Sequence, residues 1–123
     1  ISTLVFTVTF SSTSFGEWTK VTEDMKKGDT FYVDFDRIRK QDGFVYFWDL
    51  LDRLKPDEFG TLSDKVYKQG DCKLFRFKNL SFSFHNEPMG NGTGDVEEPD
   101  EKDWKYPNPN SMGGIVLKSV CSR

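Results

Sequence analysis

The chain has 123 residues, a length that indicates one domain; 15% of them are aromatic and 30% are charged. This apolar content supports one small core and excludes a disordered chain. A net charge of −3 argues against nucleic-acid binding, and the presence of a single histidine excludes any site built on several histidines.

Residues 1–16 contain no charged side chain. An apolar run at residues 4–10 is followed by small residues, an order typical of the apolar region and cleavage site of a secretory signal. We expect residues 1–16 to be a signal-peptide remnant, with the basic start of the signal lying upstream, and residues 17–123 to be the mature domain. A first β-strand is the alternative. The run is too short to span a bilayer, which takes about 20 residues.

The next segments predict two strands and a tight turn. Residues 17–22 and 30–34 are expected to form strands, with Trp18 pointing inward and a glycine-containing turn between them. A compact connection follows and ends in Asp42-Gly43, a pair typical of two-residue hairpin turns.

Residues 44–52 predict a strand that is apolar on both faces. Such a strand is either central in its sheet or covered by a partner outside the domain. The first interpretation assigns its rings to the core, and the second makes them an interface with a protein ligand or a second copy of the chain. The candidate interface residues share one face and are Phe44, Tyr46 and Trp48.

Three more strands are predicted at residues 62–71, 73–79 and 80–85. In the last one Leu80, Phe82 and Phe84 alternate with two serines and His85, which predicts a buried side and a side facing water. His85 is therefore expected to be an ordinary surface histidine.

The remaining residues predict a long loop followed by a helix. Residues 86–110 are rich in glycine, proline and acidic residues and predict a long loop. Ser111 is a candidate N-cap for a C-terminal helix, whose apolar stripe would pack on the sheet. The stripe consists of Met112, Ile115, Val116 and Val120.

Cys72 and Cys121 are the only cysteines. In an exported protein the two thiols would pair, and closing a loop of about 50 residues stabilises a fold by roughly 4 kcal/mol in the chain-entropy model. A reactive or metal-binding thiol pair is the alternative, although the close spacing of typical metal sites is missing.

Other candidate sites have simpler explanations. The acidic residues at 95–103 could hold Ca²⁺, but they lack the EF-hand spacing, so a solvated acidic loop is favoured. Asp34, Asp36 and Asp42 could form an acid pair for hydrolysis, yet turn-forming aspartates explain them more directly. We assign no catalytic residue, no metal ligand and no cofactor.

Several segments in order resemble one known family. They are Trp18 to Val21, "FYVDFDRIRKQDGFVYFWDLLD", "DCKLFRF" and "YPNPNSMGGIVLKSVC". Together they resemble the surface-adhesin protein E-like family of small exported bacterial domains, over about residues 17–121. The acidic, glycine-rich residues 89–103 depart from the pattern and look like an insertion.

The resemblance implies an α+β fold: a curved antiparallel sheet of about six strands with a short C-terminal helix packed on it and one disulfide between Cys72 and Cys121. It also implies a non-enzymatic, exported binding module that engages an extracellular or envelope protein through a sheet face, in the periplasm or at the cell surface. A homodimer that forms through that face is a further possibility. The alternative function is a non-adhesive structural domain of the periplasm or envelope.

Overall fold

The computed structural model describes residues 17–123, so the expected signal-peptide remnant at residues 1–16 lies outside the described residues. The described part is one seven-stranded antiparallel sheet with a short C-terminal helix. The strands are β1 (Thr19–Asp24), β2 (Asp29–Val33), β3 (Arg39–Gln41), β4 (Phe44–Asp52), β5 (Ser63–Asp71), β6 (Arg76–His85) and β7 (Gly94–Glu97). The helical elements are two short 3₁₀ turns, η1 (Phe35–Arg37) and η2 (Pro88–Gly90), and α1 (Met112–Cys121).

Strand β4 is central, as its two apolar faces predicted. The strand order is β1-β2-β4-β5-β6-β7, and β3 pairs with β4 beside β2. β3 is a strand that the sequence did not reveal, but the predicted hairpin turn joins it to β4. Asp42 and Gly43 both have positive φ, at 54° and 82°, which is the conformation that a two-residue hairpin turn requires.

The predicted break between strands at residues 73–79 and 80–85 is wrong. Residues 73–75 lie in the turn between β5 and β6, and residues 76–85 form the single strand β6, which pairs with β5 along its whole length. Tyr67 lies opposite Ser81 and Lys68 lies opposite Asn79, so Leu80 is an extra residue in β6. Such a β-bulge bends a strand without ending it, and a local reading of the sequence takes it for a boundary.

The predicted long loop at residues 86–110 is also partly wrong. It contains η2 and β7, and β7 pairs with the end of β6. Among the described residues β7 has no partner on its outer edge, and its Asp95 and Glu97, which lie opposite Phe84 and Phe82 of β6, are exposed. Further along, Lys105 exchanges two backbone hydrogen bonds with Phe77, at 2.8 and 3.0 Å, so the segment follows β6 a second time.

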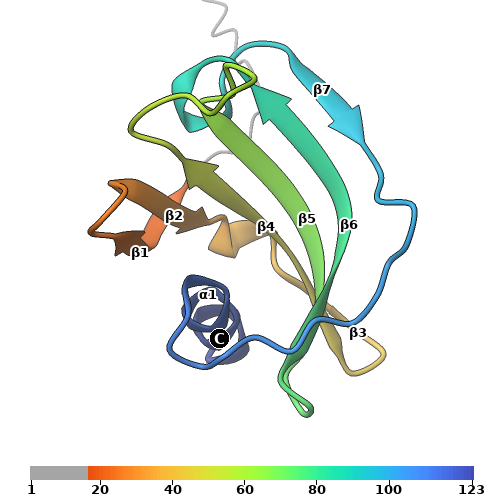
Figure 1. The fold of residues 1–123 in the computed structure, drawn as a ribbon. Helices are drawn as coiled ribbons and strands as arrows, with labels where there is room; N and C mark the ends of the chain where they lie inside the picture. The colour runs from red at the N-terminus through yellow and green to blue at the C-terminus, as the bar shows by residue number, and fades with distance from the viewer. Residues whose placement is uncertain (1–16) are drawn as a thin grey trace, which may run out of the picture.

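The predicted C-terminal helix is confirmed and packs on one face of the sheet. Ser111 caps it, since the serine Oγ accepts a hydrogen bond from Gly114 N at 3.1 Å. Figure 1 shows β4, β5 and β6 as bent strands with α1 on the inside of the bend. The core between helix and sheet consists of Val33, Val45, Phe47, Val116, Leu117 and Val120.

The predicted disulfide is confirmed. Cys72 lies in the turn between β5 and β6, and Cys121 is the last residue of α1; their sulfurs are 2.07 Å apart. Both cysteines are used, so none is free. The bond fastens the end of the helix to the turn at one end of the sheet, across a sequence separation of 49 residues.

Candidate functional site

The candidate site is the sheet face opposite α1. Side chains alternate along a strand, so Val45 and Phe47 of β4 enter the core beneath the helix, while the intervening rings lie on the other face. These rings are half-buried rather than buried. Two further half-buried rings, from β5 and from the segment after β7, contact them. We call this surface the aromatic face; its rings are Phe44, Tyr46, Trp48, Tyr67 and Trp104.

The rings of the aromatic face touch one another across strands. Tyr67 lies directly opposite Trp48 in the β4–β5 ladder, with the ring centroids 4.9 Å apart, and Tyr46 stacks on Tyr67 at 6.3 Å. Phe44 and Trp104 form a second pair at 5.7 Å. Aromatic pairs at such separations attract each other beyond their area burial, so the rings form a preorganised surface.

Basic side chains border the rings. The Arg76 guanidinium lies 4.0 Å from the ring centre of Trp104, and the Lys78 ammonium lies 4.5 Å from it. Both contacts are cation–π interactions. On the other side of β4, Arg39 pairs with Tyr46 in the β3–β4 ladder.

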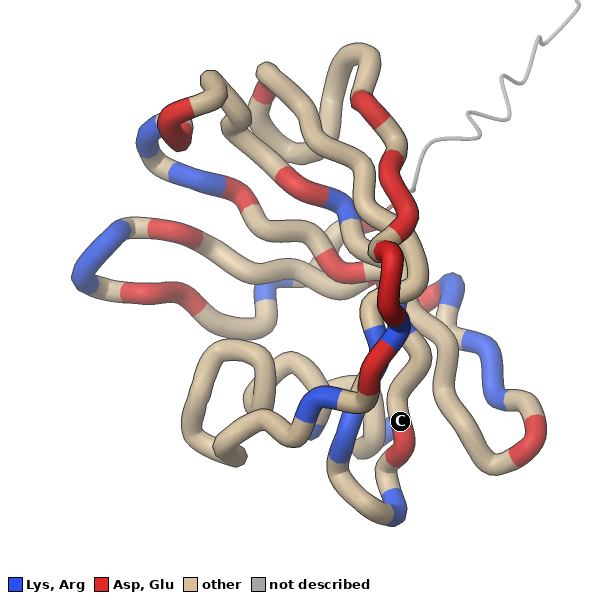
Figure 2. The backbone as a smooth tube through the Cα atoms, turned by 45° about the vertical axis from the view of Figure 1, so that its right-hand side comes forward, with Lys and Arg blue, Asp and Glu red and all other residues tan. Residues whose placement is uncertain are grey.

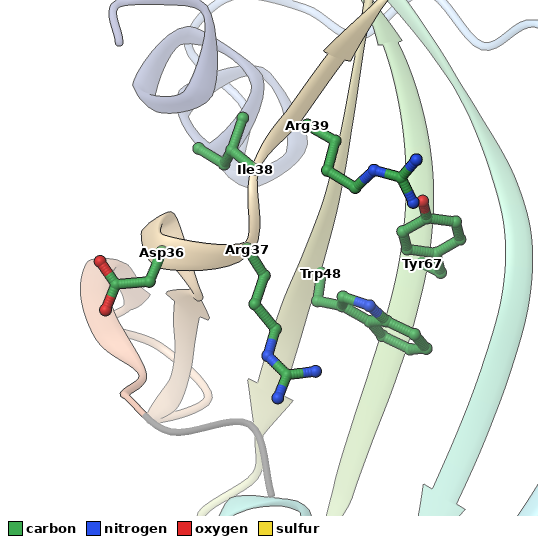
Figure 3. Close-up of a pocket in the computed structure, with 6 residues that line it drawn as sticks. All are labelled: Asp36, Arg37, Ile38, Arg39, Trp48 and Tyr67. Carbon is green, nitrogen blue, oxygen red and sulfur yellow. The ribbon is translucent and has the colours of Figure 1, made fainter. Parts of the chain in front are cut away.

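An open hollow of about 400 Å³ lies at one side of this face. The rings of Trp48 and Tyr67 form one wall, and the side chains of Arg37 and Arg39 extend toward them from the η1–β3 segment (Figure 3). Asp36 and Ile38 complete the lining. The hollow therefore combines flat apolar rings with guanidinium groups, a composition that suits binding rather than proton transfer.

The three aspartates considered for hydrolysis do not converge. Asp42 lies in the hairpin turn, as predicted, and Asp36 is exposed in η1. Asp34 begins the η1 turn, as predicted, since its carbonyl oxygen accepts a hydrogen bond from Arg37 N at 3.2 Å. Its side chain takes no part in the turn: Asp34 is 1% exposed, and its carboxylate accepts no hydrogen bond within residues 17–123. Burial raises the pKa of Asp34, although Arg37, with its Nε 3.6 Å from the carboxylate, opposes the shift.

The expectation that His85 is a surface residue is wrong, because η2 folds back over the ends of β4, β5 and β6. Met89 N donates to Asp52 Oδ1 and Gly90 N donates to Ser63 Oγ, both at 2.8 Å. His85 beneath them is 3% exposed. Burial, reinforced by the charge of Lys65, lowers the pKa of His85.

The hydrogen bonds of His85 show what it does in the fold. Its Nδ1 lies 3.2 Å from the Asn91 carbonyl oxygen and its Nε2 lies 2.6 Å from Ser83 Oγ. A carbonyl oxygen can only accept, so the neutral ring donates from Nδ1 and accepts from Ser83 at Nε2. This serine–histidine pair lies beneath η2, where it holds the following loop against β6. Phe82 and Phe84, which were predicted to be buried, are only half-buried on the opposite face.

The acidic residues in and after β7 form a run that ends one residue before Trp104 of the aromatic face. Asp95, Glu97, Glu98, Asp100, Glu101 and Asp103 are all exposed, and Figure 2 shows them as a run of red along the segment that descends from β7. We call residues 95–103 the acidic segment. Its one ion pair among the described residues is an exposed contact of 3.4 Å between Lys102 and Glu98. Within residues 17–123 no group of three or more His, Cys, Asp or Glu side chains is placed to hold a metal ion.

The sequence predicted three rings of this face and missed the rest. Phe44, Tyr46 and Trp48 lie together as expected, but Tyr67, Trp104 and the bordering cations join them only through strand pairing. A single strand shows its own alternation and not its register with neighbours. The one available signal was Trp104, an isolated aromatic residue next to an acidic stretch.

Comparison with known proteins identifies relatives at the level of family and fold. The profile of the family described as "Surface-adhesin protein E" matches residues 18–122. No match is found among curated proteins. None of the helices in residues 17–123 is long and apolar enough to cross a membrane.

Solved structures of Haemophilus influenzae protein E share the fold. One is 15% identical, has a TM-score of 0.59, and the match covers 85% of this chain and 83% of that chain. Its selenomethionine form is 16% identical with a TM-score of 0.59, covering 82% and 84%. Protein E from non-typeable H. influenzae is 15% identical with a TM-score of 0.58, covering 84% and 75%.

Proposed function

The chain belongs to the surface-adhesin protein E family, and on that premise we propose that it is an exported binding module that engages a protein partner through the aromatic face. Family membership supports an adhesin-like surface protein, and family and fold together favour a non-enzymatic role. The choice of partner class and of the binding face is our inference from the site.

The observation that carries the proposal is that the rings stay half-buried on the sheet face opposite α1. Phe44, Tyr46 and Trp48 lie on a central strand whose other face already supplies the core, so folding leaves them only half-buried. Tyr, Trp and Arg are enriched where proteins contact one another, and rings held by neighbours lose little entropy on binding. The aromatic face has this composition, with Arg39 and Arg76 at its border.

We also propose that residues 1–16 direct export and that residues 17–123 are the working domain, in the periplasm or at the cell surface. The disulfide supports this placement, because disulfides persist in oxidising compartments. Fractionation of the bacterial envelope, combined with protease treatment of intact cells, tests the location. Protection of the protein in intact cells would place it in the periplasm, and digestion would place it outside.

The binding proposal is tested with the purified full chain and immobilised extracellular-matrix proteins, by surface plasmon resonance. Tyr46→Ala and Tyr67→Ala each remove a ring from the aromatic face and should weaken binding on the order of tenfold or more. Phe59→Ala is the matched control, since Phe59 is an aromatic residue in the β4–β5 loop that is 81% exposed and has no part in the aromatic face. Far-ultraviolet circular dichroism confirms that each variant is folded.

Three results would change the proposal. Equal affinity of all three variants would move the binding site away from the aromatic face. No binding to any matrix protein would favour the alternative, a structural domain of the envelope. A dimer by light scattering that becomes a monomer on Tyr46→Ala would show that a second copy of the chain occupies the face.

A further inference from the structure

We infer that the segment of the partner that contacts the aromatic face is acidic; this inference rests on the function proposed above. It begins from one row of side chains across four strands. Arg39 of β3 lies opposite Tyr46 of β4, Tyr46 lies opposite Gln69 of β5, and Gln69 lies opposite Lys78 of β6. Paired residues point to the same face of a sheet, so the four side chains stand side by side.

Every member of this row can donate hydrogen bonds. Arg39 offers a guanidinium group, Tyr46 a hydroxyl, Gln69 an amide and Lys78 an ammonium group. An ionised carboxylate only accepts hydrogen bonds, and arginine can bind it with two at once. Neighbouring strands lie nearly 5 Å apart, so the row spans about 14 Å, enough for about four residues of an extended chain. The row therefore matches a short run of carboxylates.

The charges at the ends of the row are not neutralised within the described chain. Arg76 is paired with Asp71, Lys68 with Asp49 and Arg53 with Asp64, at nitrogen–oxygen distances of 2.6 to 2.8 Å. Neither Arg39 nor Lys78 has an ion pair among residues 17–123. Lys78 instead lies over the Trp104 ring. Two cations without carboxylate partners thus flank the rings.

The remaining charge distribution supports the same partner. The protein as a whole carries a net charge of −3, and half of the exposed acidic residues among residues 17–123 lie in the acidic segment (Figure 2). The aromatic face is left positive on a negative protein, which attracts an acidic surface and repels a basic one.

A protein segment fits this face better than an anionic polysaccharide. A sulfated polysaccharide carries a charge on nearly every repeat and needs a long track of cations, whereas the row holds two. The rings of Trp48 and Tyr67 lie beside the row, in contact with each other (Figure 3). They provide an apolar surface for the side chains next to an acidic residue of the partner.

The test measures binding of the full chain to defined probes by fluorescence anisotropy. The probes are a labelled peptide of alternating glutamate and leucine, the same peptide with glutamine in place of glutamate, and labelled low-molecular-weight heparin. We expect the glutamate peptide to bind at least tenfold more tightly than the glutamine peptide, with an affinity that falls as salt rises. Arg39→Gln with Lys78→Gln should abolish that preference. Lys26→Gln with Lys27→Gln, at exposed positions in the β1–β2 turn, is the control of equal charge change.

The outcomes separate this inference from the proposed function. If both peptides bind equally, or if neither binds, the inference that the partner segment is acidic is wrong. Binding of heparin but not of the glutamate peptide also overturns it, in favour of a polysaccharide. If Tyr46→Ala weakens binding to a matrix protein while Arg39→Gln with Lys78→Gln does not, the aromatic face is the binding site but its partner segment is not acidic. If Tyr46→Ala has no effect, the proposed function itself fails.

Discussion

Removal of the disulfide tests most directly how much the bond between Cys72 and Cys121 contributes to the stability of the fold. The variant combines Cys72→Ser, at an exposed turn position, with Cys121→Ala, at a half-buried position that packs against the core. These replacements suit the two environments and leave no thiol to react. Everything else that holds α1, including the Ser111 cap and the buried valines and leucine, is retained.

The expected magnitude follows from the loop that the bond closes. The cysteines are 49 residues apart, and the chain-entropy model gives about 4 kcal/mol for a loop of that length. A domain of this size has a free energy of unfolding of about 5–15 kcal/mol, so a large share would be lost. With a urea m-value near 1.5 kcal/mol/M, the unfolding midpoint should fall by roughly 2–3 M.

Urea unfolding followed by circular dichroism measures the change, with the oxidised protein as reference. Oxidised protein treated with a reductant during unfolding should converge on the variant. The reasoning is refuted if the variant loses less than about 1 kcal/mol, because the unfolded chain would then gain little freedom when the loop opens. Two titratable thiols in the unreduced, folded protein would refute the pairing itself.

Three further predictions concern single positions. Gly70→Ala places a Cβ 2.8 Å from a methyl group of Val45 and should cost about 1–3 kcal/mol in urea unfolding; an unchanged midpoint would show a looser core. Lys68→Met leaves Asp49 buried without the ammonium group now 2.6 Å away and should cost about 3–5 kcal/mol, most of it recovered when Asp49→Asn is added; a single variant as stable as the parent would show that water reaches the pair. His85 is the only histidine, so its NMR titration is unambiguous, and its pKa should lie below 6.5. Because the unfolded chain then binds the proton more readily, the stabilising contribution of His85 is complete above pH 6.5 and is lost as the pH falls through the lower, folded pKa; a pKa above 6.5 would contradict the burial.

The sequence predicts best those elements whose signals are local. β4 was predicted with its observed bounds from nine consecutive residues, and α1 from its apolar spacing and its cap at Ser111. The hairpin at Asp42-Gly43 is equally local, since two residues suffice to specify the turn. The pairing of two cysteines in an exported protein needed only their number and the compartment.

The failures arise where distant segments decide the environment. The bulge at Leu80 depends on the register between β5 and β6. Strand β7 depends on its pairing with the edge of β6. His85 is buried because η2 returns over it, which alternation along β6 cannot show. Only part of the aromatic face was predicted, for the same reason. The rings of β4 follow from its own alternation, whereas Tyr67 and Trp104 belong to other segments that pack beside it.

The carboxylates on β7 have a consequence for how densely the protein can be displayed. A sheet edge with unused backbone groups can recruit the edge of a neighbouring molecule and begin a fibril. Here two such edges would bring Asp95 and Glu97 of each molecule into close contact, and repulsion between like charges opposes that pairing. We expect crowded copies on an envelope to stay separate at this edge.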